Sequence, residues 1–145
     1  MIVVYTVGYE KRTLTQFLEE LRANGVAVLI DVREIAHSRK KGFAKTALRT
    51  GLEDAGIAYL HFKELGSPKE LRNKYRRDGD FPSFARAYQS SVIHRKGALP
   101  RLREAINGKK CCLLCYEDDP ARCHRSIVAA EVARTNEKET RIKHL

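Results

Sequence analysis

Uninterrupted apolar runs of strand length recur along the chain. The clearest are residues 2–7, 26–32 and 111–115, and a shorter one stands at 57–60; residues 140–144 are also expected to form a last strand. Continuous apolar runs are typical of parallel strands that are buried on both faces, whereas half-exposed strands alternate. We therefore predict about five strands in a mostly parallel sheet.

Apolar residues at helical spacing fill the segments between these runs. Thr13 is a candidate N-cap for the first helix, and Asn24-Gly25 ends it. Further helices are expected near 46–55, 84–93, 99–106 and 120–134. Because strands joined by helices form right-handed βαβ units, we predict α/β architecture: a single three-layer domain over 1–145, with a mostly parallel central sheet flanked by helices. Residues 61–80, which contain Gly66, Pro68 and Gly79, are expected to form a long basic excursion with a helical turn.

The charge of the chain is concentrated in two segments. The 145 residues carry a net charge of +10, with +5 over residues 33–50 and +8 over residues 61–110. Basic surfaces attract polyanions, and aromatic residues interleaved with cations suit stacking on bases. The same pattern also fits a solvated basic surface whose aromatic side chains pack inward. As partner we expect nucleic acid or a nucleotide, with DNA, RNA and free nucleotide all open, and no membrane; the pattern does not indicate an oligomeric state.

The opening of the sequence does not resemble a targeting segment. The first residues lack a basic n-region, and no stretch approaches the roughly 20 apolar residues of a spanning helix. We therefore expect a cytoplasmic protein. Its four cysteines, Cys111, Cys112, Cys115 and Cys123, lie close together rather than spread as in a secreted disulfide framework, so we expect reduced thiols.

Polar residues of interest follow the predicted strands. In parallel sheets, binding sites form beyond the carboxyl ends of the strands. We therefore expect the loops at 8–10, 31–43, 61–66 and 116–125 to lie together at that edge of the sheet. The second of these loops carries Asp31, Arg33, Ser38 and Arg39. An aspartate could orient an arginine there so that its guanidinium binds a phosphate, or the two could form an internal salt bridge. His61 could line the same cleft or cap its strand.

The densest group of chemically capable residues runs from Cys115 to Arg125. It begins at a strand end and enters a helix at Pro120, a favoured first-turn residue. The helix amino terminus would attract an anion, and Arg125 would strengthen that field. Glu117 and His124 could act as general acid and base, or Cys115 or Cys123 could be a thiolate nucleophile.

Zinc ligation by Cys115, Cys123 and His124 is the least favoured of these chemistries. Adjacent residues do not readily converge on one ion from a helix, and no second Cys-x-x-Cys pair completes a tetrahedral site. Cys112 and Cys115 are three apart on a strand and would point to opposite faces, which favours core cysteines. We expect no metal, and because glycine-rich phosphate loops are missing from the sequence we expect no cofactor.

Four segments, in order, resemble the bacterial and archaeal proteins grouped as domain of unknown function 488, the YeaO-like proteins: TVGYEKRTLTQFLEEL, LIDVREIAHSRKKGF, GIAYLHFKELG and LLCYEDDPARCHRSIVAAEV. The positions that match the family motif are Gly8, Tyr9, Asp31, Arg33, Ser38, Arg39, Phe43, His61, Leu65, Gly66, Cys115, Glu117, Cys123, His124 and Arg125. The sequence departs at Ala36 and Gly42, where the family often has prolines, and at Gly66, where a glycine pair is common. The resemblance implies an α/β fold and carries no established activity.

Residues 29–34 also look like the rhodanese signature, a class with a persulfide-forming cysteine at a strand end. Cys115 has such a position, but the acidic residues at 117–119 would oppose a thiolate. The leading hypothesis is an enzyme acting on nucleic acid or a nucleotide, with phosphate held by arginines and acid–base work by Glu117 and His124. The alternatives are a nucleic-acid-binding module without catalysis and a rhodanese-like sulfurtransferase that uses Cys115. The residues assigned to phosphate binding are Arg33, Ser38, Arg39 and Arg125, and those assigned supporting roles are Tyr9, Asp31, His61, Cys115 and Cys123.

Overall fold

The computed structural model describes residues 1–145 and contains one five-stranded sheet in the order β3-β2-β4-β1-β5. The strands are β1 (Ile2–Gly8), β2 (Val28–Asp31), β3 (Ala58–His61), β4 (Cys111–Cys115) and β5 (Thr140–His144). All four strand pairings are parallel, so the predicted parallel sheet of about five strands is confirmed.

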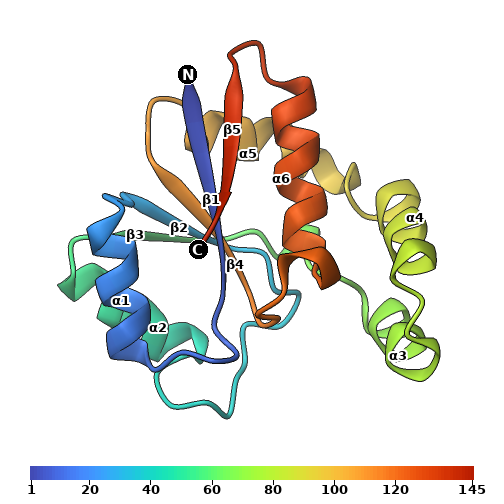
Figure 1. Ribbon diagram of the computed structural model, residues 1–145, viewed down its shortest axis with the longest axis horizontal. Helices are drawn as coiled ribbons and strands as arrows, with labels where there is room; N and C mark the ends of the chain where they lie inside the picture. The colour runs from blue at the N-terminus through green and yellow to red at the C-terminus, as the bar shows by residue number, and fades with distance from the viewer.

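Helices cover both faces of this sheet (Figure 1). They are α1 (Leu14–Ala23), α2 (Lys45–Asp54), α3 (Lys69–Asp78), α4 (Phe81–Ser91), α5 (Ala98–Ile106) and α6 (His124–Thr135), with 3-10 turns at Lys63–Leu65, Arg95–Gly97 and Pro120–Arg122. The side chains of α1 and α2 pack on one face of the sheet, and those of α5 and α6 pack on the other. The three-layer α/β class predicted from the sequence is therefore confirmed. None of the helices combines the length and apolar character needed to cross a bilayer.

Side chains of the buried strands point alternately to the two faces of the sheet and so contribute to both hydrophobic cores. On β2, Leu29 packs with Phe17 and Leu48 on the α1–α2 side, while the next residue, Ile30, faces the opposite core. Successive side chains of a strand point to opposite faces, so a strand buried on both sides must be apolar throughout. Thr13 caps α1 as predicted: its side chain accepts a hydrogen bond from the amide of Gln16.

The excursion predicted at residues 61–80 contains a 3-10 turn and helix α3, and α3 stands beside the sheet together with the following helix α4 (Figure 1). The sequence predicted only a helical turn in this segment, but α3 is a full ten-residue helix. None of its side chains is buried, which is why its sequence lacks the apolar pattern of a core helix. Gly79 ends α3 in the left-handed conformation, and the Asp80 side chain then caps α4 by accepting from the amide of Ser83.

Candidate functional site

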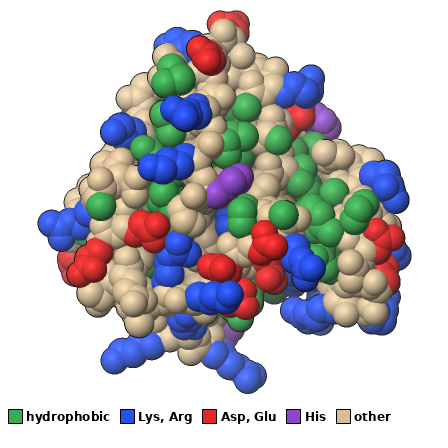
Figure 2. Space-filling model, in the orientation of Figure 1, with side chains coloured by type: hydrophobic (Ala, Val, Ile, Leu, Met, Phe, Trp, Pro, Cys, Tyr) green, Lys and Arg blue, Asp and Glu red, His purple; other side chains and the backbone are tan.

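A cleft of about 770 Å³ opens beyond the carboxyl ends of the central strands and is bounded on one side by α3 and α4. Figure 2 shows a notch between the lobe of these two helices and the rest of the molecule, with Lys and Arg side chains on both sides of it. The side chains lining the cleft are those of Tyr9, Arg33, Glu34, Ile35, His37, Ser38, Arg39, Ser67, Arg72, Tyr75, Arg76, Phe84, Cys115, Tyr116, Glu117, Arg122, Cys123 and His124. Most of the predicted site residues therefore share one cleft, while Asp31, His61 and Arg125 lie behind its walls.

Arg33 is held by a buried ion pair with Asp31. Its Nε and Nη2 donate to the two oxygens of the Asp31 carboxylate at 2.9 and 2.7 Å, and its Nη1 donates to the Phe43 carbonyl at 2.7 Å. Tyr59, which the sequence interpretation missed, donates its hydroxyl to Asp31 at 2.6 Å. Burial would lower the pKa of Arg33, but the Asp31 carboxylate outweighs it and the pKa is raised. The geometry supports the internal salt bridge, so Arg33 shapes the wall of the cleft and Tyr9 packs against it.

Arg125 is also turned toward the protein. Its Nη1 donates to the Glu117 carbonyl at 2.5 Å, its Nη2 donates to the Asp118 carbonyl at 3.3 Å, and the side chain is fully buried. Its Nε has no hydrogen-bond partner. Arg125 therefore holds the loop after β4 from the protein interior. Its positive charge can attract an anion in the cleft, but its side chain does not contact the cleft.

Arg39 and Arg76 are the exposed arginines of the cleft that make no hydrogen bond or ion pair. They come from two different walls, the loop after β2 and helix α3. Arg72 is occupied, because it pairs with Glu34 at 3.3 Å and donates to the Ser67 carbonyl. Ser38 accepts a hydrogen bond from the amide of Lys40 and so shapes the turn that carries Arg39. Arg39 and Arg76 are therefore the cleft arginines that have no partner within the protein.

His124 and Glu117 face the cleft in different protonation environments. The Nε2 of His124 donates to the Val32 carbonyl at 2.7 Å, and burial, helped by Arg125, lowers its pKa to about 4. The imidazole is therefore neutral near pH 7, so it does not act as a general acid there. Partial desolvation and the neighbouring Glu10 raise the pKa of Glu117, which suits a carboxyl group that exchanges protons.

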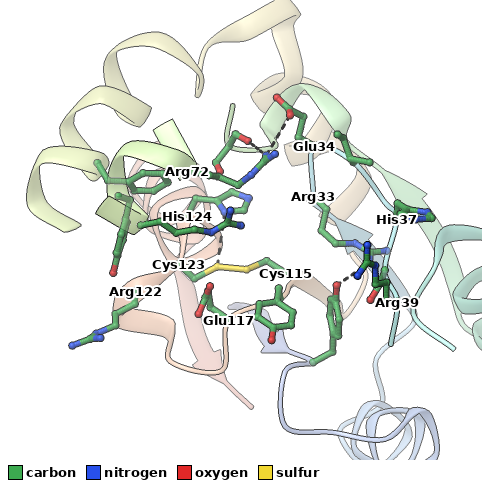
Figure 3. A pocket seen from close by; sticks show the side chains of 18 of the residues that line it. Arg33, Glu34, His37, Arg39, Arg72, Cys115, Glu117, Arg122, Cys123 and His124 are labelled. Carbon is green, nitrogen blue, oxygen red and sulfur yellow. Dashed lines mark hydrogen bonds and ion pairs between the residues drawn. A yellow bond between two sulfur atoms is a disulfide. The ribbon is translucent and has the colours of Figure 1, made fainter. Parts of the chain in front are cut away.

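Cys115 and Cys123 form a disulfide on the floor of the cleft (Figure 3). The expectation of four reduced thiols is wrong for this pair and correct for Cys111 and Cys112, which are free and buried. The reason is the backbone at Cys123: it caps α6 in an extended conformation, with φ −136° and ψ 141°, so its side chain reaches back toward β4. The 3-10 turn at Pro120–Arg122 separates that cap from the strand, where the sequence predicted a helix from residue 120.

Several supporting residues hold the loops together. The Nε2 of His61 bonds the Arg33 carbonyl at 2.7 Å, so His61 braces the loop and does not line the cleft. Tyr9 stacks on Phe43 with 4.6 Å between ring centroids. At Gly8 a Cβ atom would lie 1.8 Å from the Glu117 carbonyl oxygen, so the loop after β4 can approach β1 only because residue 8 is glycine.

The fold and the cleft define an α/β protein with a cationic site at the carboxyl edge of a parallel sheet. Residues 13–132 match the family described as "Domain of unknown function DUF488", so the chain belongs to that family. This confirms the resemblance seen in the sequence. No curated protein and no solved structure matches the chain.

Proposed function

We propose that the cleft binds the phosphate groups of a nucleotide or nucleic acid and that the protein is an enzyme acting on that ligand. The observation that carries the proposal is the combination of unpaired Arg39 and Arg76 with Glu117 in one cleft. A guanidinium fork binds phosphate oxygens bidentately, and an arginine without an internal partner breaks no interaction within the protein when it does so.

A base has a surface on which to stack beside these arginines. The ring of Tyr116 is 48% exposed at the rim of the cleft and packs edge-on against Tyr9 with 5.4 Å between centroids. Stacking on an exposed aromatic ring contributes about 1–3 kcal/mol per base. Phosphate contacts and a stacking platform together favour a nucleotide over a simple inorganic anion.

Glu117 is the acid–base group in this proposal, and His124 is a positioning residue. A carboxyl group whose pKa is raised toward neutrality exchanges protons efficiently, whereas His124 remains neutral and bonded to the Val32 carbonyl. The neutral state of His124 also favours the second candidate function, a binding module in which neither Glu117 nor His124 transfers a proton. Sulfur transfer has less support, because the Cys115 sulfur is bonded to Cys123 and an acidic loop follows it.

Binding is tested by titrating fluorescent single- and double-stranded DNA and RNA oligonucleotides, and labelled nucleotides, at several salt concentrations. We expect Arg39→Ala and Arg76→Ala each to weaken binding and each to reduce the slope of log affinity against log salt by about one. The matched control is Arg49→Ala, which removes an exposed arginine of α2 outside the cleft. If affinity for every polyanion is independent of salt, the phosphate site is rejected.

Turnover separates the enzyme from the binding module. With the bound nucleic acid or nucleotide as substrate, Glu117→Gln should keep the affinity and lower the rate of product formation by about 100-fold or more. Full binding by both the parent protein and Glu117→Gln, with no product from any tested substrate, would identify the binding module instead.

A further inference from the structure

Three potential metal ligands meet on the floor of the cleft. The Sγ atoms of Cys115 and Cys123 and a ring nitrogen of His124 all lie within 4.8 Å of one another. Figure 3 shows the two cysteines and His124 side by side, with the sulfurs facing the space between the cleft walls. Soft thiolate and imidazole ligands of this kind select zinc among the common divalent ions.

The hydrogen bond of His124 leaves Nδ1, the ring nitrogen beside the Cys123 sulfur, free to bind a metal. Because the Val32 carbonyl can only accept, Nε2 carries the proton, and Nδ1 of the neutral ring presents its lone pair. That Nδ1 lies 3.9 Å from the Cys123 sulfur. A metal-bound histidine commonly donates its other ring N–H to a backbone carbonyl, which fixes both the tautomer and the ring orientation. His124 already has this arrangement.

The backbone geometry removes the objection that adjacent residues cannot converge from a helix. Cys123 is the extended N-cap residue, and only His124 has entered α6, so their side chains do not diverge around a helix axis. The Cα atoms of Cys115 and Cys123 are 7.4 Å apart. Disulfides usually hold Cα atoms about 4.4–6.8 Å apart, so this backbone suits two sulfurs that share an ion between them.

We propose that, when the Cys115–Cys123 disulfide is reduced, both thiolates and Nδ1 of His124 bind one zinc ion whose fourth coordination position opens into the cleft. A dithiol supplies the two electrons and two protons that break the S–S bond, and is itself oxidised to a disulfide. Zinc then binds the two sulfurs and releases their two protons to solvent. Two thiolates and a neutral imidazole balance the dipositive ion.

Arg125 stabilises the reduced state. Its Nη1 lies 3.8 Å from the Cys115 sulfur, where a fixed positive charge favours the thiolate over the thiol. Three protein ligands with one open position are typical of zinc sites that bind water or a substrate group, whereas structural sites use four protein ligands. The site uses neither Arg39 nor Arg76, so it is independent of the phosphate site proposed above.

Metal content provides the test. The full chain is reduced with a phosphine under anaerobic conditions, stripped of metal, and titrated with cobalt(II) and then zinc(II). We expect one metal per chain, thiolate-to-cobalt charge-transfer absorption with tetrahedral d–d bands, and loss of these bands when zinc displaces cobalt. Reoxidation to the disulfide should release the zinc into a chromogenic chelator.

Variants locate the metal. Cys115→Ser and Cys123→Ser should each weaken metal binding by more than the roughly 10- to 100-fold that loss of an outer hydrogen-bond partner costs. Cys111→Ala is the matched control, because it removes a free cysteine of β4 that lies outside the cluster and should leave one metal bound. Circular dichroism confirms that each variant is folded.

Zinc-edge X-ray absorption on the unmodified chain does not depend on the variants. It should show two sulfurs at about 2.3 Å and nitrogen at about 2.0 Å. The proposal is overturned if the reduced chain binds no zinc, if the zinc has no sulfur ligands, or if Cys115→Ser and Cys123→Ser bind it as tightly as Cys111→Ala. Because the salt-dependent titrations are carried out on the oxidised protein, failure here does not decide the phosphate site.

Discussion

Asp31 is the residue that contributes most to the structure of the cleft wall, because its buried carboxylate holds Arg33 in place. Asp31→Asn keeps the shape of the side chain but leaves the Arg33 guanidinium, 7% exposed, without its counter-charge. Breaking a buried ion pair in this way costs about 3–5 kcal/mol, so we expect a loss of about 3 kcal/mol in the free energy of unfolding, measured by urea denaturation. Glu53→Gln breaks an exposed pair with Arg49 and should cost less than about 1 kcal/mol. Equal losses in the two variants would contradict the structural role of Asp31.

The buried imidazole of His124 makes stability depend on pH. Its folded pKa of about 4 lies below the ordinary value of 6.5, so between these values the unfolded chain binds a proton that the folded chain does not. The stabilising contribution is therefore complete above about pH 6.5 and is lost as the pH falls toward 4, up to about 3 kcal/mol.

Urea denaturation of the oxidised protein at pH 7 and pH 5 measures this effect. Replacing the imidazole in His124→Gln should remove the part of the pH dependence that it causes. His37→Gln is the control, since His37 is exposed and makes no hydrogen bond. The assignment is wrong if both variants retain the pH dependence of the parent protein.

At the scale of elements, the close approach of β1 to the loop after β4 is set by Gly8. In Gly8→Ala the new methyl group would meet the Glu117 carbonyl oxygen at 1.8 Å, and the loop must move. Overpacking of this kind costs about 1–3 kcal/mol, and displacement of Glu117 should also lower any turnover. Gly51→Ala in α2 is the matched control: its Cβ makes ordinary contact with Leu14 at 3.4 Å, and alanine favours the helix by up to about 1 kcal/mol. Thermal unfolding of both variants checks the contrast, and a Gly8→Ala protein as stable as the parent would contradict it.

Most elements that bury an apolar face could be predicted from the sequence, whereas a helix that buries no side chain could not. The apolar run at 111–115 predicted β4 with the observed bounds, because a strand that is buried on both faces must be apolar. Helix α3 was missed because it buries no side chain. The gathering of the cleft loops followed from the parallel sheet, but three features depend on backbone conformation and long-range packing: the inward turn of Arg125, the Tyr59 bond to Asp31, and the reach of Cys123 toward β4.

At the scale of the whole molecule, part of the positive charge surplus lies on the lobe beside the cleft. The lobe of α3 and α4 carries exposed cations outside the cleft, among them Lys69 and Arg77, which make no ion pair. Charges at such positions raise the rate of encounter with a polyanion more than they change the lifetime of the complex. The lobe should therefore steer the ligand toward Arg39 and Arg76 without contributing much to its retention.

Charge reversal of the lobe tests this steering. In Lys69→Glu/Arg77→Glu the association rate with a labelled oligonucleotide should fall by roughly tenfold at low salt, with the dissociation rate nearly unchanged, in stopped-flow measurements. Arg141→Glu is the control, because Arg141 is exposed and pairs with Val3 near the start of β1, at the opposite end of the strands from the cleft. Its association rate should stay close to that of the parent chain. If the lobe variant mainly accelerates dissociation, Lys69 and Arg77 contact the ligand directly, and the proposed phosphate site extends from the cleft onto α3.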